Sequence, residues 1–248
     1  MLKAYKYRIY PTKEQEEYLS KVFGCVRFIY NKMLSDKIEH YKQTGKMLKT
    51  TPAKYKKEYP FLKEVDSLAL ANVQLNLERA YNNFFRDNSI GFLKFKKKKG
   101  YQSYTTNNQN GTVDIDNGYL KVPKLKTKIK IKQHRQFEGI IKSVTISKTP
   151  TGKYYASVLV ETEKKELPKV DKKIGIDLGL KEFAILSDGT KVENPKWLRK
   201  TEKRIKKIQR DLSRKQRGSK NYEKTRIKLA KLHEKIANQR KDFLHQLS

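Results

Sequence analysis

The hydrophobic residues of this chain change their spacing twice, and this change limits the possible folds more than any other feature of the sequence. Between Leu19 and Phe84 they recur every three or four positions, as in amphipathic helices. Between Thr112 and Val160 they alternate with polar residues in short runs, as in half-buried strands. From Leu198 onward the helical spacing returns. The sequence therefore predicts an α+β protein whose helices and strands occupy separate stretches.

The N-terminal residues predict one strand and then a group of helices. Residues 2–10 alternate as a strand does. Thr12 and Gln15 have the spacing of a capping box, so a helix is expected to begin there, and Ser67 is the expected cap of a later helix. In the strand-rich stretch, short runs are punctuated by turns such as Asn117-Gly118. Strands of this length and spacing predict a small barrel or sandwich.

A second domain is expected to begin near residue 168. The stretch 161–171 is highly charged and contains Pro168, which is typical of a linker. The apolar run 174–179 follows, and then a second run and a tight turn, which together predict two antiparallel strands. The remaining residues predict a two-helix hairpin with a narrow apolar seam.

The charge of the chain indicates a polyanionic partner. Its 58 Lys and Arg residues face 26 Asp and Glu residues, which gives a net charge of +32. Nucleic acid is the first candidate and an anionic membrane surface the second. No stretch approaches the ~20 apolar residues of a membrane span, and no secretion signal is evident, so we expect an intracellular protein. Cys25 is the only cysteine, so a multi-cysteine zinc site is not expected.

The predicted helical hairpin carries the densest charge. Residues 196–241 contain 19 Lys and Arg but only 4 Asp and Glu. A solvated helix face usually carries both acidic and basic residues, because like charges four positions apart repel each other. Contact with phosphates is therefore preferred here over a merely solvated face. The expected contacts are Arg204, Lys207, Arg210, Arg214 and Arg217.

A second basic segment has aromatic residues among its lysines. Lysines can neutralise phosphates, and aromatic rings can stack unpaired bases. The alternative is a basic linker whose aromatic residues only anchor it to a core. The candidate contacts are Lys94, Phe95, Lys96, Lys97, Lys98, Lys99 and Tyr104.

Asp177 is the candidate catalytic and metal-binding residue. It is a single carboxylate within an apolar run, and Gly175 and Gly179 lie on either side of it. A buried charge is costly unless it is paired or binds a metal, and a carboxylate at a strand end is a common ligand of Mg²⁺. An ion pair with one of the many lysines is an equally good explanation of this spacing.

Taken together, six segments resemble the TnpB (OrfB) family of insertion-sequence proteins, which are related to the type V CRISPR effectors. Each segment alone is a weak pattern, but six in this order along nearly the whole chain are specific. They are KYRIYPT (6–12), GCVRFIYN (24–31), LNLERAYNNFF (75–85), FKKK (95–98), GIDLG (175–179) and NQRKDFLH (238–245).

The resemblance implies an architecture and an activity. Residues 1–10 and 90–167 would form a wedge-like β-barrel, 11–89 a helical recognition insert similar to a helix-turn-helix, and 168–248 the incomplete start of a RuvC-like (RNase H-fold) domain. The family binds a guide RNA, reads and unwinds double-stranded DNA, and cuts it with Mg²⁺. Four further residues in the matching segments would contact nucleic acid: Tyr7, Arg8, Arg27 and Asn31.

The same resemblance implies an incomplete nuclease site. Asp177 would be the first of three carboxylates, and the other two and the family's zinc ribbon are not in this sequence. We therefore expect no cleavage by this chain alone and no bound zinc. We also expect the residues after about 168 to be poorly packed or docked on a partner, and the protein to be cytoplasmic, nucleoid-associated and prokaryotic. A non-enzymatic nucleic-acid-binding remnant or repressor is the alternative. An actin-like ATPase, which also uses a GIDLG-type strand, is disfavoured because too little chain follows.

Overall fold

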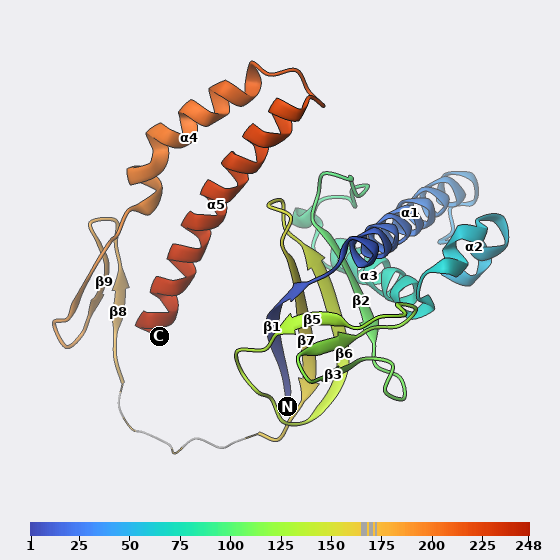
Figure 1. Cartoon of the computed structure of the whole chain (residues 1–248), viewed down its shortest axis with the longest axis horizontal. Helices are drawn as coiled ribbons and strands as arrows, with labels where there is room; N and C mark the ends of the chain where they lie inside the picture. The colour runs from blue at the N-terminus through green and yellow to red at the C-terminus, as the bar shows by residue number, and fades with distance from the viewer. Residues whose placement is uncertain (165–167, 169–170, 172) are drawn as a thin grey trace. The chain divides into compact units, whose positions relative to one another are not determined.

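The computed structural model describes residues 1–164, 168, 171 and 173–248, and the chain divides into two units, 1–164 and 165–248 (Figure 1). The boundary expected at 167/168 involves residues outside the described part. Each unit is considered by itself below. Mixed helices and strands agree with the α+β prediction.

Unit 1 is built on a seven-stranded antiparallel sheet in the order β2-β6-β7-β1-β5-β4-β3. The N-terminal strand thus lies in the middle of the sheet, paired with β7 on one side and β5 on the other. The strands are β1 (Leu2–Tyr10), β2 (Gln102–Asn107), β3 (Asp114–Asp116), β4 (Tyr119–Lys121), β5 (Ile129–Lys132), β6 (Ile140–Lys148) and β7 (Tyr154–Glu161).

The sheet is a curled half-barrel, which corrects the expectation of a barrel. Its edge strands, β2 and β3, lie at opposite ends of the hydrogen-bonded order but are joined by residues 108–113 alone. Six residues span at most about 20 Å, so the sheet must curl until its two edges approach (Figure 1). Because β3 has only three residues, it offers little backbone with which to close the barrel.

The helices of unit 1 are α1 (Lys13–Thr44), α2 (Pro52–Glu58) and α3 (Ser67–Arg86), with the short 3₁₀ helices η1 (Pro60–Glu64) and η2 (Asn88–Ile90). The predicted capping box is confirmed, since Thr12 and Gln15 bond reciprocally at the start of α1. Residues 13–44 form one continuous helix, which ends at Gly45 with a φ of 68°.

Asp66, and not Ser67 as expected, caps α3. Its carboxylate accepts the backbone N–H groups of Leu68 and Ala69, and also the hydroxyl of Thr106 in β2. Asp66 therefore joins the start of α3 to the sheet. The helices α1 and α3 pack on each other and on β2, and their apolar faces form one core with the inner face of the sheet.

Unit 2 contains the predicted helical hairpin and the two predicted antiparallel strands, and it adds a third strand that the sequence did not predict. The strands are β8 (Ile176–Leu178), β9 (Glu182–Leu186) and β10 (Lys191–Glu193), and the helices are α4 (Trp197–Ser213) and α5 (Lys220–Leu247). Its buried apolar cluster is small and consists of Ile205, Leu232 and Ile236.

The strand β8 leaves its apolar side chains uncovered. Ile176 is 61% exposed and Leu178 is 70% exposed, and β8 is an edge strand. Incomplete packing after residue 168 was the expectation from sequence, and these exposures agree with it. Among the described helices, none has a stretch apolar and long enough to span a bilayer.

Candidate nucleic-acid interface

The basic segment 94–99 is fixed to helix α1 by side chains one turn apart. The amide of Asn31 donates to the carbonyl oxygen of Lys96 (2.9 Å) and accepts the backbone N–H of the same residue (2.8 Å). Arg27 donates to the side chain of Gln102 (3.1 Å). Gln102 in turn donates to the carbonyl oxygen of Lys98 (2.7 Å). The structure thus brings together two of the predicted segments, 24–31 and 95–98.

Lys96 differs from its neighbours in this segment. Its Nζ lies 4.2 Å from the centre of the Tyr30 ring, and desolvation lowers the pKa of its ammonium group, although the residue as a whole keeps exposed surface. The ammonium group of Lys96 thus makes a cation–π contact with the ring of Tyr30. Lys96 is better suited to hold the segment on α1 than to contact phosphate, whereas Lys94, Lys97, Lys98 and Lys99 are exposed.

The aromatic residue available for base stacking here is not the expected one. Tyr104 lies in the core, 6% exposed, with its ring 5.8 Å from that of Phe23, so it has no free face for a base. Tyr101 is 74% exposed, and Phe95 is 50% exposed. Tyr101 also lines a small pocket of about 270 Å³ with Arg27 and Lys97. The prediction for Tyr104 is therefore wrong, because Tyr104 and Thr106 lie on the buried face of β2 and the adjacent residues Ser103 and Thr105 lie on the other face.

Asn31 allows a direct test of the anchored segment. We expect Asn31→Ala to weaken binding of single-stranded RNA about fivefold, because the lost pair of hydrogen bonds frees the lysines to sample other positions. Titration with a fluorescent RNA measures this change. Asn76→Ala, which removes an exposed amide from α3, is the matched control. Equal affinities for wild type and Asn31→Ala would show that the anchor is dispensable.

The strand β1 presents a second basic surface, but not through both predicted residues. Tyr7 is 1% exposed in the core and donates to the carbonyl oxygen of Arg135 (2.7 Å), so its predicted contact with nucleic acid is wrong. Arg8 points to the other face. Its guanidinium carbon lies 5.2 Å from the centre of the Tyr155 ring and 5.3 Å from that of Tyr10.

The residues around Arg8 were missed from the sequence. Lys6 also lies over Tyr155, at 4.9 Å, and Arg8 pairs across the sheet with Lys132. Stacking on tyrosine orients a guanidinium group and leaves most of its N–H donors free for phosphate. The alternation of β1 was the available signal: once Tyr7 and Ile9 face inward, Lys6, Arg8 and Tyr10 must face outward.

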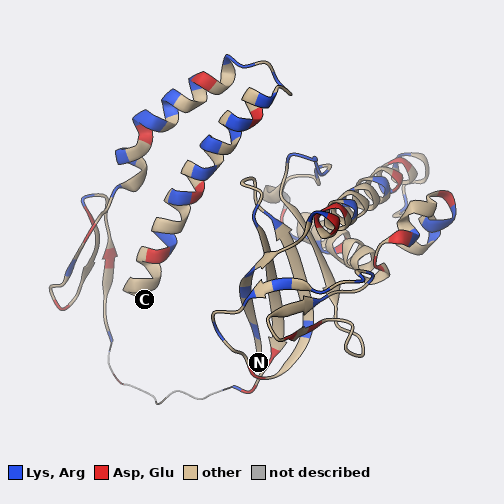
Figure 2. Ribbon diagram, viewed as in Figure 1, with Lys and Arg blue, Asp and Glu red and all other residues tan. Residues whose placement is uncertain are grey.

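The helical hairpin is the largest basic surface in unit 2. Figure 2 shows basic residues along the whole length of α4 and α5 with few acidic ones between them. All five predicted contact residues are exposed, and within the described part of the chain none of them has a carboxylate partner. Three of them lie on α4 and the other two follow its last residue, and none of the five belongs to the buried cluster around Ile205. These residues are Arg204, Lys207, Arg210, Arg214 and Arg217.

Asp177 is exposed on β8, which corrects the expectation of a buried carboxylate. It pairs with Ile185 of β9, which pairs with Lys191 of β10. Among the described residues there is no group of three or more His, Cys, Asp or Glu side chains that could bind a metal ion. Mg²⁺ prefers six oxygen ligands, so Asp177 by itself does not make a magnesium site.

Comparisons with known proteins agree with the resemblance. The family OrfB_IS605, described as "Probable transposase", matches residues 157–248, and HTH_OrfB_IS605, described as "Helix-turn-helix domain", matches residues 1–46. In the structure those 46 residues contain β1 and the single helix α1, so no helix-turn-helix is formed within them.

Two relatives match almost the entire chain. One is "Putative RNA-guided DNA endonuclease" of Streptomyces pristinaespiralis, 36% identical over 99% of this chain and 63% of the relative. The other is "Putative RNA-guided DNA endonuclease InsQ" of Escherichia coli, 34% identical over 100% of this chain and 62% of the relative. The chain thus spans just over three fifths of their length.

A solved structure shares the fold. It is described as "Cryo-EM structure of the Cas12f1-sgRNA-target DNA complex", and it matches 95% of this chain and 61% of its own with a TM-score of 0.50 and 12% identity. The whole-length relatives, the two matched families and the common fold lead to one assignment. The chain belongs to the TnpB (OrfB) family of insertion-sequence proteins.

Proposed function

We propose that this chain binds a guide RNA together with the double-stranded and unwound DNA that the RNA pairs with. The observation that carries the proposal is the whole-length match to relatives named RNA-guided DNA endonucleases. The structure supports it with three exposed basic surfaces, which are the segment 94–99, the face around Arg8, and the hairpin of α4 and α5. Neutralising a folded RNA and a heteroduplex requires cations on this scale.

The proposed division of labour follows the predicted domains. Residues 1–10 and 90–167 form the wedge-like part, 11–89 the recognition insert, and 168–248 the start of a RuvC-like domain. The position of β1 between β7 and β5 supports the first of these, because residues 1–10 and the strands after residue 90 share one sheet. Guide RNA would be held mainly by the wedge-like part, with base pairing supplying the choice of DNA.

For cleavage, we propose that Asp177 is the first carboxylate of a RuvC-like centre and that these 248 residues alone do not cut DNA. Mg²⁺ would supply activation of water and stabilisation of the leaving oxygen. Asp177 lies exposed on an edge strand and offers a single pair of carboxylate oxygens. Two-metal cleavage needs several oxygen ligands for each ion. The chain would then act as a nucleic-acid-binding protein or repressor.

Sequencing of the RNA that copurifies with the chain, followed by a cleavage assay with Mg²⁺, tests both parts. We expect a discrete RNA species and no cut in target DNA. Asp177→Ala should leave RNA and DNA affinity unchanged within about twofold, because one exposed carboxylate makes a small contribution to binding. Cleavage that disappears in Asp177→Ala would refute the inactivity proposal. Failure to retain any RNA or DNA near 0.1 M salt would refute the binding proposal.

A further inference from the structure

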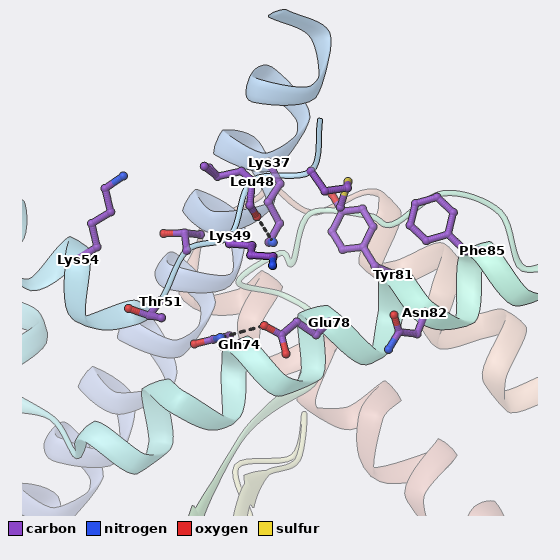
Figure 3. A pocket seen from close by; sticks show the side chains of 12 residues that line it. Lys37, Leu48, Lys49, Thr51, Lys54, Gln74, Glu78, Tyr81, Asn82 and Phe85 are labelled. Atoms are coloured by element: carbon purple, nitrogen blue, oxygen red, sulfur yellow. Dashed lines mark hydrogen bonds between the residues drawn. The ribbon is translucent and has the colours of Figure 1, made fainter. Parts of the chain in front are cut away.

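A pocket of about 680 Å³ opens on unit 1, and none of its lining residues belongs to the segment 94–99 or to the face around Arg8. It lies between the end of α1, the segment 46–51, the start of α2 and the second half of α3 (Figure 3). Its volume is in the range of about 300–1,000 Å³ that is typical of small-ligand sites. None of its lining residues was among the candidate contacts from the sequence.

Lys37 supplies a buried cation to this pocket. Its side chain comes from α1 and is 7% exposed, and its Nζ donates to the carbonyl oxygen of Leu48 at 2.6 Å. An ammonium group has three protons to donate, and within the described part of the chain Leu48 is its only hydrogen-bond partner. Burial lowers the pKa of Lys37, and the nearby Glu78 acts in the opposite direction. The group can therefore donate to an acceptor that enters the pocket.

Aromatic and sulfur-containing side chains form one wall. The rings of Tyr81 and Phe85, one turn apart on α3, lie nearly parallel, with centres 6.2 Å apart and planes 24° apart. Tyr81 is only 7% exposed and backs Phe85, which is 63% exposed, and Met47 on the segment 46–51 is 42% exposed. Such a wall suits a flat, apolar group that slides between α3 and the segment 46–51.

The other lining groups suit a ligand that is both polar and anionic. Lys49 and Lys54 line the side formed by residues 46–54, and neither has a carboxylate partner among the described residues. The amides of Gln74 and Asn82 lie on α3, and Gln74 donates to Glu78 at 2.8 Å (Figure 3). Together they offer donors and acceptors at hydrogen-bond positions beside the flat wall.

We propose that this pocket binds one unpaired nucleotide of the bound nucleic acid. The base stacks on the exposed ring of Phe85, a base acceptor accepts a hydrogen bond from Lys37, and Lys49 and Lys54 neutralise the adjacent phosphates. A nucleotide is the ligand that combines a flat ring, edge donors and acceptors, and a negative phosphate. The proposal rests on the proposed function, because it presupposes that the chain binds RNA or DNA.

Photo-cross-linking with the full chain tests the proposal. The probes are mixed-sequence single-stranded RNA containing 4-thiouridine and single-stranded DNA containing 4-thiothymidine, and the adducts are located by mass spectrometry. We expect adducts on peptides that contain Met47, Tyr81 or Phe85. The RNA and DNA arms show which of the two strands supplies the nucleotide.

Substitutions in the pocket complement the cross-linking experiment, because their effect on binding affinity can be measured. Phe85→Ala should weaken binding of the single-stranded probe about five- to tenfold and leave a fully paired duplex unaffected. Leu75→Ala is the matched control, because Leu75 is 54% exposed on the same helix but does not line the pocket. Lys54→Gln should weaken binding more than Lys57→Gln, which lies outside the pocket on the same helix.

The possible outcomes separate this proposal from the proposed function. Normal affinity with adducts only on the segment 94–99 or the hairpin would overturn the pocket and leave the proposed function in place. Equal effects of Phe85→Ala and Leu75→Ala would also overturn it. If neither probe binds at all, the proposed function itself fails.

Discussion

Replacing Arg204, Lys207, Arg210 and Arg214 by glutamine will weaken binding of RNA about 100- to 1,000-fold near 0.1 M salt. Each phosphate contact releases condensed counterions and contributes about 0.7–0.9 to the slope of log K against log salt. Four lost contacts should therefore also reduce that slope by about 3. Fluorescence anisotropy titrations at several salt concentrations measure both quantities.

The fold of the hairpin should survive these four substitutions. The four residues are exposed and none belongs to the buried cluster between α4 and α5, and glutamine has nearly the helix propensity of arginine and lysine. Removing like charges from one helix face also relieves repulsion. Circular dichroism should show unchanged helix content, so that a loss of affinity reports on contact rather than on unfolding.

A matched set separates local contact from total charge. The control replaces four exposed lysines of unit 1 by glutamine, which changes the net charge by the same amount: Lys13, Lys42, Lys46 and Lys63. We expect this control to weaken binding less than tenfold. If both sets reduce affinity equally, the hairpin has no special role and the long-range field of the chain accounts for binding.

Asp66→Ala will lower the free energy of unfolding of unit 1 by about 2–4 kcal/mol. Loss of a helix cap costs about 0.5–2 kcal/mol, and Asp66 caps α3 through two backbone N–H groups. The substitution also leaves the hydroxyl of Thr106 without its acceptor, and Thr106 is 0% exposed. A buried unsatisfied hydroxyl costs about 1–3 kcal/mol. Urea denaturation measures the total.

A double-mutant cycle isolates the Thr106 part of this effect. Thr106→Val alone should destabilise the protein, but in the Asp66→Ala background it should recover about 1 kcal/mol, because the orphaned hydroxyl is then removed. Asp114→Ala, an exposed carboxylate on β3, is the control and should change stability by less than about 0.5 kcal/mol. Strict additivity of the two substitutions would contradict a direct Asp66–Thr106 contact.

The sequence predicted the type and order of most elements because their signals are local. Hydrophobic spacing and the Thr12–Gln15 pair depend only on neighbouring residues, and the structure confirms that pair. The cap of α3 was misplaced by one residue because Asp66 and Ser67 have similar capping propensity. What distinguishes them is Thr106, forty positions away, which only tertiary structure brings to Asp66.

The candidate site was predictable in its composition but not in the direction of its side chains. In β1 both alternating phases contain aromatic residues, so the sequence could not tell that Tyr7 faces the core and Tyr10 the solvent. In β8 the apolar run suggested burial of Asp177. Burial also requires an element to cover the strand, and the described residues do not cover Ile176 and Leu178.

The central position of β1 has a consequence for synthesis of the protein on the ribosome. The first strand to emerge pairs along nearly its whole length with β7, the last strand of the same sheet, and Met1 donates to the carbonyl oxygen of Thr162. Until residue 161 has been translated, Tyr7 and Ile9 lack the β7 strand beside them. The nascent chain then exposes β1 with unpaired backbone N–H and C=O groups and uncovered apolar side chains, which favours aggregation. If translation ends before β7 has been synthesised, the released fragment should therefore aggregate rather than fold into a smaller functional protein.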